Sequence, residues 1–159
     1  MKTYVLTLSR VFPAKHKKKG QSTFFRDKFH AAISRNDEYW NKLHTIRANY
    51  PLWKKRFEQI ERGEACLSVR QWTGKPYASK QEEIARLTKD DGIGLQMLRF
   101  ARYSDGFIYL DSAHVDDHDL QVMELAKNDG LDYGDWLSWF KGYNLSEPLA
   151  IIQFTKFRY

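Results

Sequence analysis

The sequence contains a single cysteine, Cys66, and only 4 prolines among its 159 residues. One cysteine cannot close an intramolecular disulfide, and Cys66 lies in the apolar run Ala65–Leu67, so we expect it to be a small core residue rather than a nucleophile. No stretch approaches the roughly 18 uncharged apolar residues that a membrane helix needs. The first ten residues are also too short and too alternating for a signal peptide. These absences predict a cytoplasmic protein with no membrane partner.

Several catalytic signatures are missing as well. The chain has no Gly-rich phosphate loop, no Gly-x-Ser-x-Gly elbow and no Cys-x-x-Cys pair, which argues against kinases, dehydrogenases, α/β-hydrolases and zinc ribbons. The nearest approach to a metal motif is His114 with His118, which would share a face only on a helix, whereas a loop leading into a helix cap suits these residues better. We therefore expect no metal and no cofactor.

What is present is enough apolar surface for a folded core. Hydrophobic residues make up 42%, charged residues 29% and aromatic residues 15%, which predicts one domain over residues 1–159. The net charge of +6 is uneven, since residues 1–63 hold 15 Lys and Arg against 5 Asp and Glu, and residues 64–159 hold 11 against 15. The basic half suits a polyanionic partner such as RNA, although ordinary globular proteins also carry basic surfaces.

The apolar pattern predicts short strands and short helices in irregular order. A period-two pattern over residues 4–9 indicates an opening strand, and residues 11–41 resemble an insertion made of a basic loop and a helix capped by Ser22 or Thr23. We expect further strands over 44–49, 65–72, 93–100, 107–110 and 149–157, and helices over 22–33, 51–63, 80–87, 116–126 and 132–140. Trp136, Trp139 and Phe140 have the spacing of a buried helix face. This order favours an α+β fold around a small mixed sheet or barrel.

The segment Lys42-Leu-His-Thr-Ile-Arg47 is the most informative for chemistry. On a strand, Thr45 and Arg47 point to the same side. If that side faces a cavity, two cations and a hydroxyl converge on one small volume, which suits an anionic or polar planar ligand. The alternative is a surface-charged strand with only Ile46 in the core.

Two further groups of residues have the composition of nucleic-acid contacts. Arg70, Trp72, Lys75 and Tyr77 interleave cations with aromatic rings, and we expect their loop to lie at the mouth of the same cleft. The alternative is that Trp72 ends a core strand and the lysines are only solvated. The other group is a basic loop, expected to be mobile and either to order on phosphate or to remain solvated; its cations are Lys15, Lys17, Lys18 and Lys19.

An ordered set of motifs resembles the ASCH family. The set begins with Lys42-x-x-Thr45-Ile46-Arg47 and continues with Gly63 and the strand to Val69. It ends with Ala126-x-x-Asp129-Gly130-Leu131, Trp139-Phe140 and the run 151–157. The resemblance covers residues 41–159 and implies a PUA-like fold, a small mixed β-barrel flanked by short helices. It also implies binding of RNA or a nucleotide.

One branch of that family hydrolyses the amide of N4-acetylcytidine, and its proposed catalytic Lys, Thr and acid match Lys42, Thr45 and Asp129. Three hypotheses follow. The first is an RNA- or nucleotide-binding domain with a basic cleft, in which the ligand contacts Arg47, Arg70, Trp72, Lys75 and Tyr77. The second is an amidohydrolase in which burial makes Lys42 neutral, Asp129 orients it and Thr45 is nucleophile or oxyanion donor. The third is a protein-interaction module that uses Phe24, Phe25 and Phe29, and the oligomeric state stays open.

Overall fold

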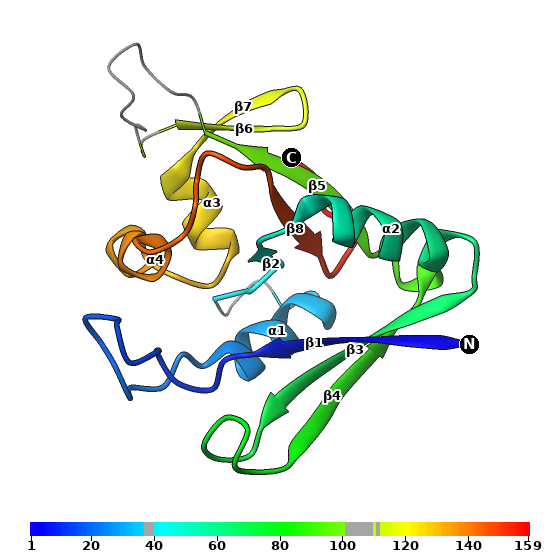
Figure 1. The fold of residues 1–159 in the computed structure, drawn as a ribbon, viewed down its shortest axis with the longest axis horizontal. Coiled ribbons are helices and arrows are strands. Elements are labelled where there is room, and N and C mark those ends of the chain that lie inside the picture. The colour runs from blue at the N-terminus through cyan, green and yellow to red at the C-terminus, as the bar shows by residue number, and fades with distance from the viewer. Residues whose placement is uncertain (37–39, 101–109, 111) are drawn as a thin grey trace.

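The strands form two open sheets in the computed structural model, which describes residues 1–36, 40–100, 110 and 112–159. The first sheet has the order β1-β3-β4, made of Lys2–Leu8, Ala65–Trp72 and Gln81–Leu87, with β1 parallel to β3 (Figure 1). The second has the order β2-β8-β5-β6-β7 and is antiparallel throughout; its strands are His44–Arg47, Leu149–Gln153, Gly94–Arg99, Ser112–Val115 and His118–Gln121.

The α+β class is therefore confirmed, whereas a closed barrel is wrong for the described strands. Closure requires backbone pairing between the sheets, and no pair of described strands supplies it. Instead, the Arg47 side chain at the end of β2 donates a hydrogen bond from Nη2 to the carbonyl oxygen of Thr7 in β1, at 2.6 Å. A side chain, not a ladder of backbone hydrogen bonds, links β1 to β2.

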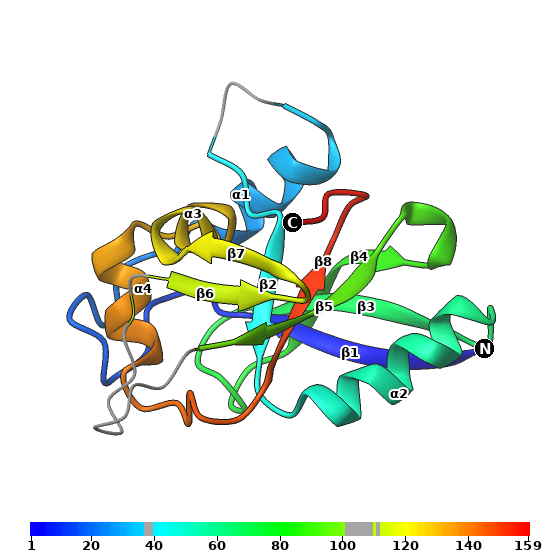
Figure 2. The ribbon, with the colours of Figure 1, turned by 90° about the horizontal axis from the view of Figure 1, so that it is seen from above.

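Four α-helices pack around the sheets in the described ranges: α1 (Phe25–Ile33), α2 (Tyr50–Glu61), α3 (Val122–Asn128) and α4 (Tyr133–Phe140). Helix α2 contacts β3 of the first sheet and β5 and β8 of the second, so it spans the junction between them (Figure 2). Helices α3 and α4 contact each other, and α3 also contacts β7. None of the described helices combines the length and apolarity needed to cross a bilayer.

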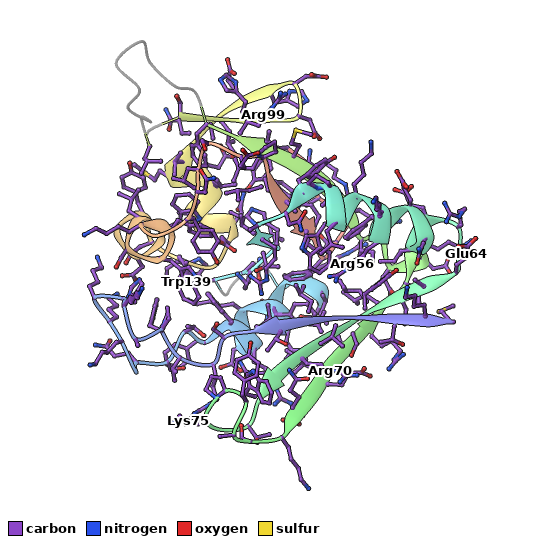
Figure 3. All side chains as sticks on the ribbon, viewed as in Figure 1. Arg56, Glu64, Arg70, Lys75, Arg99 and Trp139 are labelled. Atoms are coloured by element: carbon purple, nitrogen blue, oxygen red, sulfur yellow. The ribbon has the colours of Figure 1, made fainter. Side chains whose placement is uncertain are left out.

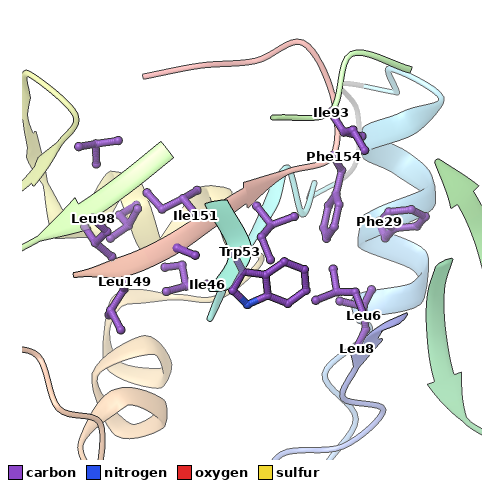
Figure 4. Packing of buried hydrophobic residues seen from close by; sticks show 14 of the residues in the cluster. Leu6, Leu8, Phe29, Ile46, Trp53, Ile93, Leu98, Leu149, Ile151 and Phe154 are labelled. Carbon is purple, nitrogen blue, oxygen red and sulfur yellow. The ribbon is translucent and has the colours of Figure 1, made fainter. Parts of the chain in front are cut away.

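One hydrophobic cluster joins all of these elements. Every residue of β8 is buried because this strand lies between β2 and β5. Leu6 and Leu8 of β1 meet Ile46 of β2 and Trp53 of α2 in this core (Figure 4). The expected insertion is an integral part of it, since Phe29 of α1 is fully buried and lies edge-to-face on Phe154 with ring centroids 4.9 Å apart.

Residues 81–87 form strand β4, so the helix expected over 80–87 is wrong. Gln, Glu, Ala, Arg and Leu all favour helices, and the local composition gives no sign of a strand. The loop over residues 73–80 turns the chain back on itself, however, and β4 pairs antiparallel with β3 from Trp72 opposite Gln81 to Leu67 opposite Leu87. Tertiary pairing overrides helix propensity here.

The helix expected over 116–126 begins only at Val122. Asp116 and Asp117 are the two turn residues of a hairpin in which Val115 pairs with His118, and Asp116 has a φ of 50°. Aspartate suits tight turns as well as helix caps, so the sequence alone did not separate the two. His114 and His118 consequently lie on hairpin strands, and the described residues contain no cluster of three or more His, Cys, Asp or Glu able to hold a metal.

The remaining differences concern the ends of elements. The final strand stops at Gln153 rather than 157, and β2 stops at Arg47 because Asn49 caps α2 by accepting a hydrogen bond from the Leu52 amide. The strand expected over 107–110 lies outside the described residues except for Leu110. The helix over 132–140 is confirmed, with Asp132 as its cap. Cys66 is buried, as expected.

Candidate functional site

Lys42 and Asp129 form a buried ion pair. Lys42 Nζ donates to Asp129 Oδ1 at 2.6 Å and to the carbonyl oxygen of the same residue at 2.7 Å. The ammonium also lies 4.0 Å from the centroid of the Phe25 ring. Only 2% of the Lys42 side chain and 4% of the Asp129 side chain are exposed. The carboxylate of Asp129 thus reaches the ammonium group of Lys42 directly.

Local structure explains why these residues, 87 positions apart, meet. Asp129 is the C-cap of α3, so its carbonyl oxygen has no partner within the helix and is free to accept from Lys42. Gly130 follows with a φ of +79°, and a Cβ there would lie 3.2 Å from the Lys42 Cβ. On the other side, backbone hydrogen bonds from Lys42 to Lys28 and from Leu43 to Asn128 fix the approach to β2. The Asp-Gly helix end is thus what opens the space that the lysine fills.

Burial shifts the pKa of each partner in the direction that favours its uncharged form. Desolvation lowers the pKa of Lys42, and the nearby Arg47 cation lowers it further, while Asp129 opposes both effects. Desolvation likewise raises the pKa of Asp129 against the attraction of Lys42. A lowered pKa for Lys42 is the result expected when a lysine is buried beside a second cation.

Thr45 and Arg47 point to the same side of β2, as the strand period requires. Arg47 Nη1 donates to Thr45 Oγ1 at 2.9 Å and to the carbonyl oxygen of Ile46 at 3.1 Å. Thr45 is buried and Arg47 is half-buried. Arg47 therefore has two roles, since it also contacts Thr7 of β1 and joins the two sheets at the edge of the site.

These four polar residues line one small cavity. Its accessible volume is about 20 Å³, room for one or two heavy atoms, and it opens to solvent. The polar residues of its wall are Ser9, Lys42, Thr45, Arg47 and Asp129, and its apolar wall consists of Leu8, Phe25, Ile46, Leu131, Trp139 and Phe140. The motif strand and the Asp-Gly helix end therefore meet at one place, with aromatic rings around it.

The sequence did not reveal a second layer behind this cavity. His44 is fully buried, and its Nε2 lies 2.6 Å from the Tyr159 hydroxyl, which also accepts from Asn128 Nδ2 at 3.0 Å. His44 Nδ1 faces Asp129 Oδ1 at 3.8 Å. Burial and the Lys42 charge hold the pKa of His44 well below its usual 6.5. The one sign of this second layer in the sequence is the alternation of side chains along a strand, which places His44 on the face opposite Thr45.

The basic loop, expected to be mobile, is packed against α4 in the structure. His16 is buried, its Nε2 lies 2.8 Å from the carbonyl oxygen of Asp135, and its ring contacts Trp139 with centroids 5.9 Å apart. Lys18 donates to Asp135 Oδ2 at 2.7 Å, and Lys17 lies 3.5 Å from the other carboxylate oxygen. Two of the four loop cations are thus paired, while Lys15 and Lys19 are exposed and form no ion pair with the described residues.

Arg70, Trp72, Lys75 and Tyr77 do not join the cavity. Leu8 lines the cavity, whereas Thr7 points to the opposite face of β1, and Arg70 is paired in register with Thr7. Figure 3 shows the separation: Trp139 lies beside α4, and Arg70 and Lys75 lie on the β3–β4 hairpin beyond β1. The expected single cleft is therefore not formed, since none of these four residues lines the cavity and the strand register places Arg70 on the face away from it.

The three phenylalanines proposed as an interaction surface are also separated. Phe25 and Phe29 belong to the core, and only Phe24 is exposed, at 60%. A contiguous aromatic patch on α1 is therefore not formed by these residues.

Comparisons with protein-family models, curated proteins and solved structures find no match to this chain.

Proposed function

We propose that this chain binds a nucleoside or nucleotide, either free or as one residue of an RNA, at the cavity lined by Lys42, Thr45, Arg47 and Asp129. The observation that carries the proposal is the convergence of these four side chains on one opening surrounded by aromatic rings. They come from β2, from the segment just before it and from the end of α3. Binding sites of this kind place a few fixed polar groups among apolar walls.

The cavity size indicates which part of the ligand enters. About 20 Å³ cannot hold a base, but it accommodates an exocyclic oxygen or amine while the ring lies outside against the half-buried Trp139. Thr45 supplies a hydroxyl, Asp129 an acceptor and Arg47 a cation for that group. The small opening and the pairing of Lys17 and Lys18 favour a ligand of one nucleotide over a long strand in an open groove.

Titration calorimetry with cytidine, uridine and their 5′-monophosphates tests this proposal. We expect Thr45→Val to weaken binding because it removes the hydroxyl and keeps the side-chain volume, and Lys55→Ala on the exposed face of α2 serves as the control. Loss of one hydrogen bond predicts a roughly 3- to 10-fold weaker Kd. Equal affinity of Thr45→Val and wild type, or no binding of any of these ligands, would contradict the proposal.

A second candidate, deacylation of an N4-acylated cytidine, is favoured by the contact between Lys42 and Asp129 beside Thr45. In this reaction water adds to the acyl carbon, either directly or after the acyl group has passed to Thr45 Oγ1 as an ester that water then hydrolyses. The C–N bond breaks, the exocyclic nitrogen leaves as the amine with the proton that the nucleophile gives up, and the carboxylic acid is released. Lys42 is held by Asp129 and covered by Phe25, so its role in the reaction is to orient Asp129 and supply charge rather than to attack the acyl carbon.

Release of acetate from N4-acetylcytidine tests the second candidate, with Thr45→Ala and Asp129→Asn as variants. Both should abolish turnover, and binding of the product cytidine should persist at least in Asp129→Asn, whose amide can still accept a hydrogen bond. Binding without turnover in the wild type would leave the first proposal standing and remove the second.

A further inference from the structure

The β3–β4 hairpin carries a rigid loop. Thr73 donates to the carbonyl oxygen of Lys80 from both its amide, at 2.9 Å, and its hydroxyl, at 3.0 Å. Ser79 Oγ accepts from the Gly74 amide at 3.0 Å and donates to the carbonyl oxygen of Lys75 at 2.8 Å. These hydrogen bonds join the two sides of the loop at two positions, so the loop has this shape without a ligand.

That rigid loop presents an aromatic ring to solvent. Tyr77 is 91% exposed and has a φ of +62°, a conformation that costs free energy in any residue except glycine. Its ring centroid lies 5.2 Å from that of the half-buried Trp72, with an interplanar angle of 51°. A strained backbone that holds a large ring almost fully in water gains little for folding, so this arrangement points to a ligand.

The two lysines beside the Trp72 and Tyr77 rings have no described carboxylate to pair with. Lys75 and Lys80 are exposed, and neither forms an ion pair with a residue that the structure describes. The neighbouring carboxylates are already paired, Glu82 with Arg26 at 2.8 Å and Glu83 with Arg86 at 3.0 Å. In the basic loop, by contrast, Asp135 pairs with two of the four lysines, Lys17 and Lys18.

We propose that the surface formed by Trp72, Lys75, Tyr77 and Lys80 is a binding site for single-stranded nucleic acid. One base stacks on the exposed Tyr77 ring, and the adjoining phosphates lie beside Lys75 and Lys80. Stacking of bases on aromatic side chains beside cations is the general mode of single-strand binding. The free cations favour this occupant over a proline-rich peptide, which would use the rings but not the charges.

None of the residues of this site lines the cavity, and the site does not depend on it. Loss of nucleoside binding at Thr45 leaves the hairpin site intact, and loss of the hairpin site leaves the cavity intact. If both sites hold, one strand of RNA can be anchored at the hairpin while a nucleotide is bound elsewhere on the same molecule.

Fluorescence anisotropy of short labelled oligouridylate and oligothymidylate measures binding at the hairpin. We expect Tyr77→Ala to weaken binding of both probes by about 5- to 150-fold, the range expected for loss of one base–aromatic stack. Tyr77→Phe should stay within about 2-fold of wild type because the ring is kept. The slope of log K against log salt is negative, and Lys75→Ala should make it shallower by about 0.7.

Phe24→Ala is the matched control, because Phe24 is also an exposed aromatic residue at positive φ, 56°, but precedes α1 as its N-cap. Tyr77→Gly relieves the backbone strain and should bind as weakly as Tyr77→Ala with no loss of thermal stability, which separates binding from folding. Wild-type affinity in Tyr77→Ala, an equal loss in Phe24→Ala, or binding of a proline-rich peptide but of neither oligonucleotide would overturn the proposal.

Discussion

Lys42 donates two hydrogen bonds to Asp129, one to its carboxylate and one to its carbonyl oxygen, at 2.6 and 2.7 Å. The same lysine therefore neutralises the acid and satisfies the C-terminal end of α3. Because both side chains are almost completely buried, each charge depends mainly on the other for its stabilisation. The pair is part of the fold as well as part of the cavity wall.

Lys42→Met should lower the free energy of unfolding by about 3 to 5 kcal/mol, since it leaves a buried acid without its cation. Urea unfolding followed by far-UV circular dichroism measures this. The double variant Lys42→Met, Asp129→Leu should recover most of the loss because it removes both charges. A single variant as stable as the wild type would show that the pair contributes nothing. Thr45 variants are for this reason the safer probes of binding.

Gly130→Ala should destabilise the protein by about 1 to 2 kcal/mol, because the residue has a φ of +79°. The new methyl group would also press on Lys42 Cβ from 3.2 Å. Gly142→Ala is the control, since a Cβ at Gly142 meets no atom within 4 Å. Thermal unfolding of the two variants should therefore differ clearly, and equal melting temperatures would contradict the packing described around Lys42.

His44 should make the protein sensitive to acid. Its pKa is held well below 6.5 in the folded state, so below pH 6.5 the unfolded chain takes up a proton that the folded protein refuses. The free energy of unfolding should then fall by up to about 1.4 kcal/mol for each pH unit below 6.5. His44→Gln should remove this component, whereas His118→Gln, at an exposed position, should retain it. Parallel profiles for wild type and His44→Gln would exclude the effect.

Lys18→Glu should release the basic loop from α4, because it replaces the cation nearest Asp135 with an anion. The expected result is faster trypsin cleavage near residues 15–19, with the rest of the protein still folded. Lys19→Glu removes an equivalent cleavage site but breaks no ion pair with the described residues, so its cleavage rate should stay near that of the wild type. Equal rates in both variants would mean that the Lys18–Asp135 contact does not hold the loop.

The sequence predicted the elements whose signals are local. The alternation in β1 and the capped helix α4 appear in the structure as expected. Strand β4 was missed because its residues favour a helix, and only pairing with β3 makes it a strand. The turn at Asp116 was mistaken for a helix cap because aspartate serves both purposes.

For the site, the strand period placed Thr45 and Arg47 on one side, and the structure adds Asp129 to them. The motif resemblance suggested this grouping, although composition and spacing could not. Strand alternation puts Thr7 and Leu8 on opposite faces of β1, and the register of β1 and β3 pairs Arg70 with Thr7, so Arg70 lies on the face away from the cavity. That register is a long-range property, and no local pattern in either strand specifies it.

The ion pair between residues 42 and 129 also has a consequence for how the chain folds. Contacts between residues far apart in sequence require a large loop to close before they contribute, which slows folding. The cavity cannot exist until α3 has docked against the start of β2, so it forms only when the two ends of that long segment have met. Mutations at this pair should accordingly change the unfolding rate more than the folding rate if α3 docks after the main folding barrier.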